Sequence, residues 1–348
     1  GKYASDMVDM GSFESVLGRY ESPASNGRMA QAENLKTYQV EDDPQLYLAG
    51  YDDINSKKIK PLPLHSRNSL GRYHSPLYKT FAKIAIAKAS EGMEDLTSVL
   101  LVACTPAYDY HKPEVQAQLT AILKDLHKIK VNNVVQAVNV SHVELMSETE
   151  AVLYDLYFLE DGHVDPDNAS MVEEDNLVIN LGFGTSDVSR YNRMGYVKLP
   201  KETLTTSFRD VYSQCANWLS TVLQRQVDVQ DVANQLEPQQ GEAIKKYVYS
   251  GESISDFDSI YKKALKDVYA DLLAELNSIL DDPDQFNRIV AAGGAVNEWG
   301  NDLKKWNRRV QIPVNPQFAP VRGMYKFGKY FALPQLHAQD QAEITTKN

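Results

Sequence analysis

Short apolar runs recur along the chain and predict strands. They lie at Leu46–Ala49, Ser98–Cys104, Val134–Val140, Leu177–Leu181 and Arg288–Ala292. The run Ser98–Cys104 contains no charged residue and is closed by Thr105-Pro106. Such an uninterrupted run predicts a strand that is buried on both faces.

Between these runs, apolar residues recur at helical spacing. Ser75-Pro76 is typical of an N-cap followed by proline in the first turn, so a helix is predicted to begin there. Further helices are predicted at Val115–Lys128, Ser147–Leu159, Leu204–Gln224 and Asp258–Leu280. The polar segments Ser22–Glu33 and Gln335–Asn348 predict a loop and a frayed tail. Strands and helices mix along the whole chain, and this mixture indicates an α/β fold.

The composition is that of an ordinary globular protein and excludes several other classes. The 348 residues are 43% hydrophobic and 24% charged, and this length favours two domains. The formal charge of −11 argues against direct binding to DNA or anionic lipid, because phosphate recognition needs a basic surface. No uncharged apolar stretch approaches the roughly 20 residues that span a bilayer. With only Cys104 and Cys215, the chain has no disulfide scaffold, and a reducing cytoplasm is its expected location.

Several familiar catalytic motifs are absent from the sequence. It has no G-x-x-x-x-G-K-[ST] phosphate loop, no G-x-S-x-G nucleophile elbow and no H-E-x-x-H zinc motif. Two glycine turns remain as candidate ligand-binding segments, and each follows a predicted strand.

The first turn is Leu181-Gly182-Phe183-Gly184-Thr185. Polar and apolar residues alternate after Gly184, so the chain is predicted to return as a strand and to form a β-hairpin. Glycines at the tip would let backbone N–H groups approach an oxyanion. An ordinary tight hairpin without a ligand is the alternative.

The second turn is Ala292-Gly293-Gly294-Ala295, between a predicted strand and a helix. Paired glycines there would let a flat ligand or a phosphate lie against the backbone. Each turn alone is compatible with simple packing. Together, roughly a hundred residues apart in one chain, they favour a nucleotide held between two lobes.

These elements, in this order, resemble the actin-type ATPase fold and, within it, the bacterial plasmid-partition actins of the ParM/StbA type. Leu181–Ser189 is similar to the second phosphate hairpin of that family, and Arg288–Val296 is similar to its adenosine loop. Ala319–Gly328 is similar to the closing segment, a short helix that returns to the first lobe. Val102–Pro106, followed by a helix, is similar to the strand before the interlobe region of that family. Gly71-Arg72-Tyr73 occupies a position where some relatives have a similar Arg-Tyr pair.

The resemblance implies an α/β actin-like fold with two lobes, each a mixed sheet flanked by helices, and a nucleotide cleft between them. Lobe I would span 1–175 and lobe II 176–315, and 316–348 would form the returning helix and a polar tail. ATP or ADP with Mg²⁺ would bind at Gly182, Phe183, Gly184, Thr185, Asp187, Gly293, Gly294, Ala295 and Asn297.

The chain departs from the family pattern at three places. The first phosphate loop, D-x-G-N/S-x-x-x-K, is missing, so we expect a short strand with an Asp-x-Gly-type turn upstream of Gly1. Asn180 stands where relatives have the aspartate that orients Mg²⁺-bound water, and Ala295 replaces a third glycine. Nucleotide binding should survive these two changes, although Asn180 should slow hydrolysis. Asn180→Asp should then raise the rate if the new carboxylate faces the metal.

The family also uses a carboxylate that positions the attacking water. Glu144, after the strand Val134–Val140, falls at the matching offset. A glutamate in the first turn of the next helix, complementing the helix dipole, is the alternative role for Glu144. Glu148 and Glu150 are alternative candidates for the catalytic carboxylate.

The resemblance implies a cytoplasmic bacterial ATPase that polymerises into filaments and segregates plasmid DNA through a DNA-binding adaptor. A chromosomally encoded cytoskeletal protein for cell shape and a small-molecule kinase of the same fold are the alternatives. The kinase would need a catalytic aspartate near the first phosphate loop, and the sequence does not show one.

Overall fold

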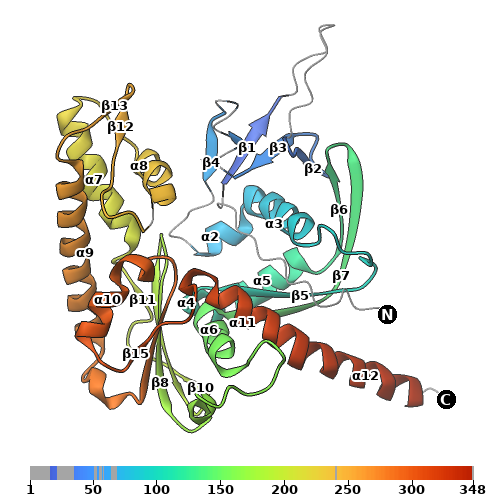
Figure 1. Cartoon of the computed structure of the whole chain (residues 1–348). Helices are drawn as coiled ribbons and strands as arrows, with labels where there is room; N and C mark the ends of the chain where they lie inside the picture. The colour runs from blue at the N-terminus through green and yellow to red at the C-terminus, as the bar shows by residue number, and fades with distance from the viewer. Residues whose placement is uncertain are drawn as a thin grey trace, which may run out of the picture. The chain divides into compact units, whose positions relative to one another are not determined.

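The computed structural model describes residues 16–21, 35–50, 53–54, 57, 59–63, 69–239 and 241–346 (Figure 1). The predicted loop Ser22–Glu33 and the surroundings of Gly1 lie outside these residues. Contacts group the chain into two compact units, Gly1–Val102 with Lys112–Leu145, and Ala103–His111 with Met146–Asn348. This grouping assigns residues 146–175 and 316–348 to the second unit. The lobe limits 1–175, 176–315 and 316–348 stay a prediction.

The first unit is built on a seven-stranded sheet of order β4-β1-β3-β2-β6-β7-β5. Its strands are β1 (Val16–Tyr20), β2 (Tyr38–Val40), β3 (Leu46–Ala49), β4 (Pro61–Pro63), β5 (Val99–Thr105), β6 (Leu126–Val131) and β7 (Val134–Ser147). The predicted strand Leu46–Ala49 is confirmed residue for residue. The pairs β1–β3, β2–β6 and β6–β7 are antiparallel.

Helices α2 (Ser69–His74), α3 (Pro76–Ala89) and α5 (Pro113–Leu123) accompany this sheet. Helix α3 begins at Pro76 with Ser75 at the N-cap, as predicted. Its Ile84 is fully buried, and Leu77 and Phe81 pack on the same cluster, which includes Leu17 of the sheet. One apolar face of α3 thus closes the core of this unit.

Two predictions for the first unit are wrong, one in the end of a helix and one in the burial of a strand. The helix predicted at Val115–Lys128 ends at Leu123, because Leu126–Val131 pairs with Val134–Asn139 as a hairpin. Leu126, expected on the inner helix face, is 48% exposed. Strand β5 is also only half-buried from Val99 to Cys104, and it is the last strand of the sheet among the described residues. Among the described residues, β5 has a neighbouring strand on one side only. Its side chains are therefore less buried than the apolar run predicted.

The second unit contains a mixed sheet of order β10-β9-β8-β14-β15, with β11 beside β9. Its strands are β8 (Asp175–Leu181), β9 (Ser186–Asn192), β10 (Gly195–Val197), β11 (Thr203–Leu204), β14 (Arg288–Ala292) and β15 (Val310–Gln311). The β8–β9 pair is antiparallel, and the β14–β8 and β14–β15 pairs are parallel. The strands predicted at Leu177–Leu181 and Arg288–Ala292 are confirmed.

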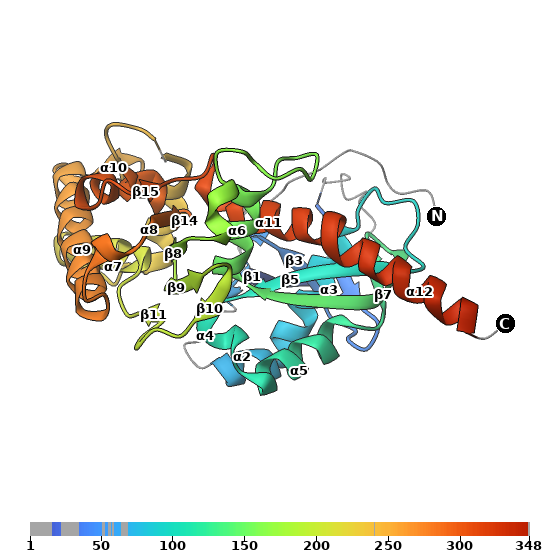
Figure 2. The same ribbon diagram turned by 90° about the horizontal axis from the view of Figure 1, so that it is seen from below.

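Helices cover both faces of this second sheet (Figures 1 and 2). One face packs against α7 (Phe208–Val222), α8 (Val229–Leu236), α9 (Phe257–Ile279) and α10 (Val296–Trp306). The other packs against α6 (Glu148–Tyr157) and α11 (Ala319–Phe327). Along β8, Leu177, Ile179 and Leu181 enter the first core and Val178 enters the second, as the two-residue period of a strand requires.

Short elements complete the second unit. They are α4 (Ala107–Tyr110), β12 (Val248–Tyr249), β13 (Glu252–Ser253) and the turns η1 (Ala169–Val172), η2 (Glu237–Gln239), η3 (Pro283–Gln285) and η4 (Pro316–Phe318).

The closing helix α11 lies directly on the backbone of α6. A Cβ atom at Gly323 would stand 1.7 Å from the Ala151 carbonyl oxygen, so only glycine fits at this contact. Arg322 binds the Asp155 carboxylate through two nitrogens, at 2.9 and 2.5 Å. The buried Lys326 donates to the Asp155 carbonyl oxygen at 2.7 Å and lies 3.1 Å from its carboxylate. The predicted short helix at Ala319–Gly328 is therefore confirmed, and it packs on α6.

The C-terminal segment is helical, so the predicted frayed tail is wrong. A π-helical turn, η5 (Gly328–Ala332), leads into α12 (Leu333–Thr346). The segment is polar, but Ala, Gln, Glu and Leu in it are strong helix formers, and Pro334 stands in the first turn, where proline is tolerated. Polarity alone was an insufficient reason to expect disorder.

Candidate functional site

The first glycine turn forms the tip of the β8–β9 hairpin, as predicted. Leu181 pairs with Ser186, and the Gly182 N–H donates to the Thr185 carbonyl oxygen at 2.9 Å. A Cβ atom at Gly184 would meet nothing within 4 Å, and Gly184 is exposed. The tip therefore presents backbone to open space, as an anion-binding loop requires.

Helix α7 packs against the base of this tip. The Arg209 N–H donates to the Phe183 carbonyl oxygen at 2.9 Å, and the rings of Phe183 and Tyr212 lie 5.9 Å apart. A capping box at Ser207 and Asp210 fixes the start of the helix. The hairpin tip is thus held at its base while Gly184 stays uncovered.

The second glycine turn lies against the base of the first. Gly293 has φ +94°, and a Cβ atom there would stand 2.3 Å from the Leu181 carbonyl oxygen. The Ala295 N–H donates to that same oxygen at 3.2 Å, and the Gly293 N–H donates to the Pro316 carbonyl oxygen at 2.9 Å. The two turns, far apart in sequence, therefore meet at Leu181.

The remaining predicted residues of the second turn differ in accessibility. Ala295 is buried, Gly294 is half-buried and Asn297 is exposed in the first turn of α10. A Cβ atom at Gly294 would come no closer than 3.8 Å to the Gln317 side chain. Gly294 and Asn297 can therefore reach a ligand, whereas the Ala295 side chain belongs to the core.

Asn180, at the end of β8, bonds to Glu148, the first residue of α6. Its Nδ2 donates to Glu148 Oε2 at 2.6 Å, and Asn180 is only 5% exposed. No group among the described residues bonds to the buried Oδ1 of Asn180. Ser147 caps the helix by accepting from the Glu150 N–H at 3.0 Å. Glu148 thus places a carboxylate at the positive end of the helix dipole.

Glu144 does not precede a helix directly, because β7 continues to Ser147. It is a half-buried residue of that strand and belongs to the first unit. Its alternative role as a first-turn helix residue is therefore wrong, while its catalytic role stays a prediction. The structure brings together Asn180 and Glu148 instead. The capping signal Ser147-x-x-Glu150, which sets the start of α6, would have pointed to Glu148.

Asp187 is fully buried behind the tip, where its Oδ1 accepts from the Thr203 hydroxyl at 2.5 Å. Beside it, a buried hydroxyl cluster joins the start of α6 to β9. The Thr149 hydroxyl bonds to Ser189 at 2.9 Å and to Tyr191 at 3.0 Å. Burial raises the pKa of Tyr191, so its hydroxyl stays protonated and can donate. The sequence analysis missed Thr149 and Tyr191, which hold the hairpin against α6.

The described residues contain no group of three or more His, Cys, Asp or Glu side chains able to hold a metal. Mg²⁺ bound with a nucleotide usually keeps several waters and is held by phosphates and one or two carboxylates. Glu148 is the carboxylate of the site that fits this pattern. The buried Oδ1 of Asn180 has no hydrogen-bond partner among the described residues, so it has an acceptor to offer to a bound water.

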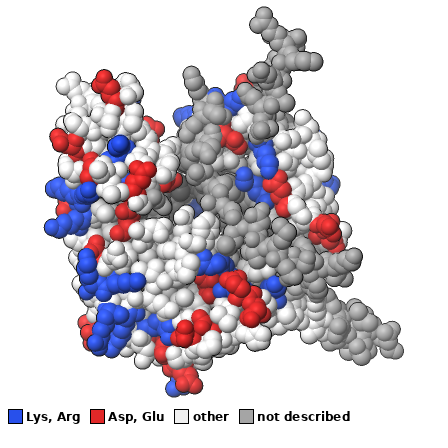
Figure 3. Space-filling model, viewed as in Figure 1, with Lys and Arg blue, Asp and Glu red and all other residues white. Residues whose placement is uncertain are grey.

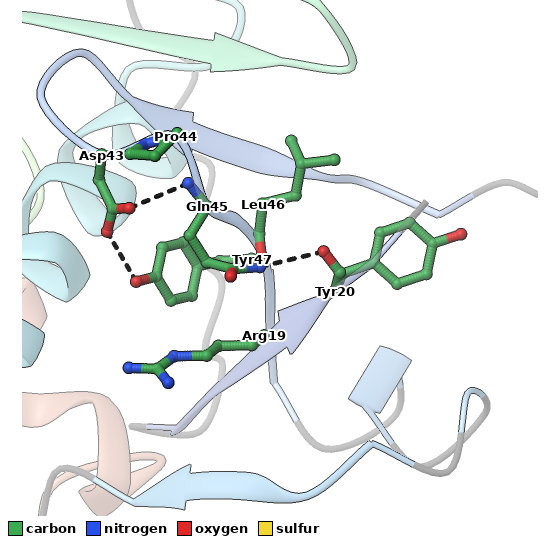
Figure 4. A pocket seen from close by; sticks show the side chains of 7 residues that line it. All are labelled: Arg19, Tyr20, Asp43, Pro44, Gln45, Leu46 and Tyr47. Atoms are coloured by element: carbon green, nitrogen blue, oxygen red, sulfur yellow. Dashed lines mark hydrogen bonds between the residues drawn. The ribbon is translucent and has the colours of Figure 1, made fainter. Parts of the chain in front are cut away.

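A separate hollow of about 450 Å³ lies in the first unit (Figure 4). Asp43 accepts there from the Tyr47 hydroxyl at 2.7 Å and from the Gln45 N–H at 2.9 Å. The lining residues are Arg19, Tyr20, Asp43, Pro44, Gln45, Leu46 and Tyr47. None of the predicted site residues is among them.

Charges of both signs are interspersed over the described surface in the view of Figure 3. Among the described helices, none combines the length and the apolar character needed to cross a membrane.

Residues 2–149 match a family model described as the N-terminal domain of actin-like proteins. The chain is also similar in structure to Ta0583, an archaeal actin homolog, with a TM-score of 0.70 and 15% sequence identity. That alignment covers 91% of this chain and 92% of the other. The chain has the actin-like fold.

Structures of ParM are similar to this actin-like protein over the same length. The pCBH ParM non-polymerisable quadruple mutant has a TM-score of 0.69 and 19% identity, covering 92% of this chain and 93% of that one. A subunit of the 15-stranded ParM filament from Clostridium botulinum has a TM-score of 0.64 and 18% identity, with the same coverage of 92% and 93%. Ta0583 in complex with ADP has a TM-score of 0.65 and 14% identity, covering 90% of each chain. No curated protein sequence matches the chain. The predicted resemblance to ParM-type actin-like proteins is therefore confirmed.

Proposed function

We propose that this protein binds and hydrolyses Mg²⁺-ATP and polymerises into filaments that segregate DNA through a DNA-binding adaptor. The observation that carries the proposal is the meeting of two glycine turns at Leu181, one with an open backbone tip and one tightly packed. The ADP complex of the similar Ta0583 and the filament of the similar ParM support it.

In this proposal the hairpin tip binds phosphate and the second turn binds the nucleoside. Backbone N–H groups around Gly184 would donate to phosphate oxygens, with Thr185 adding a hydroxyl. Gly294 and Asn297 would contact the sugar or the base from the start of α10. Asp187 is fully buried and accepts a hydrogen bond from Thr203. Its proposed contribution is therefore to hold the hairpin tip in shape.

Hydrolysis would be an in-line attack of water on the γ-phosphate. We assign the water-positioning role to Glu148, because its carboxylate lies at the helix N-terminus beside Asn180. Bound Mg²⁺ would neutralise phosphate charge, and catalysis would consist mostly of positioning and electrostatics.

The proposed partners are further copies of this chain and a basic adaptor. A chain with a formal charge of −11 is repelled by DNA, so force on DNA would have to pass through such an adaptor. The proposed location is the bacterial cytoplasm.

Light scattering and phosphate release, measured together on the full-length protein, test this function. We expect filaments with Mg²⁺-ATP, and disassembly that follows hydrolysis.

Glu148→Gln should lower phosphate release by about 10²–10⁴-fold while filaments still form and persist. Glu144→Gln is the matched control and should leave the rate unchanged. Loss of hydrolysis in the Glu144 variant alone would move the catalytic role back to Glu144. A protein that stays monomeric at tens of micromolar with Mg²⁺-ATP would contradict the filament and favour the kinase alternative.

A further inference from the structure

Strand β8 carries two buried asparagines, one near each end, whose amides are used differently. The Asn176 amide donates to main-chain oxygens, Met171 O at 2.9 Å and Glu174 O at 3.2 Å. The Asn180 amide donates to a carboxylate, Glu148 Oε2 at 2.6 Å. Both side chains are at most 5% exposed. Asn176 therefore fixes the local chain, whereas Asn180 fixes the direction of another side chain.

We infer that Asn180 is a positioning residue, whose amide N–H holds the Glu148 carboxylate in the orientation needed for hydrolysis. The inference rests on the proposed function, since it assigns Asn180 a role through Glu148. It also assigns a function to the amide at position 180, where the family pattern has an aspartate.

Only a hydrogen-bond donor can make this contact with an ionised carboxylate. An amide N–H to a carboxylate is a charge-assisted bond, which is shorter and stronger than a neutral one. The bond uses Oε2 of Glu148 and restricts rotation about the end of the side chain, so Oε1 keeps a fixed direction. An aspartate at 180 would instead place two carboxylate groups at contact distance, and their repulsion would turn Glu148 away.

Asn180 is a hydrogen-bond donor to Glu148, and other groups near this contact are neutral or bound elsewhere. From β5, the half-buried Cys104 lies close enough that its pKa is raised by desolvation and by the charge of Glu148, so the thiol stays neutral. The cations of α11, Arg322 and Lys326, are bound to Asp155, seven residues further along α6.

The inference predicts the opposite of the sequence-based expectation for Asn180→Asp. Both Asn180→Asp and Asn180→Ala should lower kcat for ATP, by up to about 10²-fold, because a small displacement of a positioned group has an effect of this size. KM for ATP should stay nearly unchanged, since Asn180 acts through Glu148. A rate that rises in Asn180→Asp would overturn the inference.

A double-mutant cycle separates positioning from damage to the fold. In the Glu148→Gln background, Asn180→Ala should cause no further loss of kcat, because the group that it positions is gone. Asn176→Ala is the matched control, from the same strand and with similar burial. It should lower the melting temperature, and any loss of kcat that it causes should be the same in both backgrounds. Additive losses for Asn180 would overturn the inference.

The exchanged pair, Glu148→Gln with Asn180→Asp, adds a measurement that does not depend on activity. It restores an amide–carboxylate bond in the reverse direction, so its melting temperature should exceed that of Asn180→Asp alone, while hydrolysis stays low. If Glu148→Gln hydrolyses ATP at the wild-type rate, the proposed function of Glu148 fails. If Glu148→Gln is slow but Asn180→Ala keeps the wild-type kcat, only the role of Asn180 fails.

Discussion

The two glycine turns of the second unit look alike in sequence but differ in what holds them. At Gly293, φ is +94° and the Leu181 carbonyl oxygen would stand 2.3 Å from an added Cβ atom. At Gly184, φ is ordinary and an added Cβ atom would meet nothing within 4 Å. The fold therefore requires glycine at 293 and places no such demand on 184.

This difference separates structural glycines from functional ones. A residue that the fold requires will be glycine whether or not a ligand binds. A glycine that the fold does not require has another reason for its small size, and at the hairpin tip the proposed reason is the close approach of a phosphate. Substitutions at the two turns should therefore affect different measurements.

The largest effect is expected for Gly293→Ala. The substitution combines an unfavourable backbone conformation with a clash against main chain that cannot move aside. We expect a loss of about 3 kcal/mol or more in the free energy of unfolding, measured by urea titration. Gly92→Ala is the matched control, since Gly92 has φ +81° but no atom near its Cβ position. It should lose only about 1 kcal/mol. Equal losses at the two positions would show that the contact with Leu181 is unimportant.

An intermediate effect is expected for Glu275→Gln, which loosens the support behind the hairpin tip. Burial raises the pKa of Glu275, but bonds from Lys201, Thr205 and the Thr206 N–H outweigh this and lower it to about 2. These bonds anchor the loop that leads into α7, and α7 in turn holds the tip at Phe183.

Because the pKa of Glu275 is lower in the folded chain, its stabilisation is complete above the ordinary value of 4.5 and disappears as the pH falls toward 2. Glu275→Gln should therefore lower the free energy of unfolding by about 1–3 kcal/mol at pH 7. The difference from wild type should shrink in urea titrations at pH 3. A difference that is the same at both pH values would show that the charge of Glu275 does not matter.

The smallest effect on stability is expected for Gly184→Ala. The unfolding free energy should change by no more than about 0.5 kcal/mol, as for a surface substitution. Affinity for Mg²⁺-ATP, measured by calorimetry, should fall by about tenfold or more, the loss that one hydrogen bond of about 1.4 kcal/mol would cause. Unchanged affinity would favour the alternative of an ordinary hairpin without a ligand.

The parts of the fold that depend on local signals were predictable. The start of α3 follows from Ser75-Pro76, and β14 follows from an apolar run that stops at Gly293. The hairpin at Gly182 follows from the apolar run before the glycines and the alternation of polar and apolar residues after Gly184. Each signal lies within a few residues of the element that it specifies, so tertiary contacts only reinforce it.

The errors arose where a distant partner decides the structure. Leu126 fits a helical stripe, but the segment after it pairs with β7 and becomes a strand. Glu144 was chosen by counting from a strand that was predicted to end at Val140, whereas β7 runs to Ser147. The neighbour of Asn180 is therefore Glu148, and no local pattern shows that contact across 32 residues.

The contact between α6 and α11 also restricts the order in which its residues can change during evolution. Lys326 is only 4% exposed, and Asp155 is the buried carboxylate with which it is paired. A lineage that loses Asp155 first leaves the buried Lys326 with the exposed carboxylate of Glu160, 3.3 Å away, in place of a buried partner, which is destabilising. A lineage that loses Lys326 first still has Arg322 to neutralise Asp155. Related sequences should therefore include chains with Asp155 and no lysine at 326, and lack chains with the reverse combination.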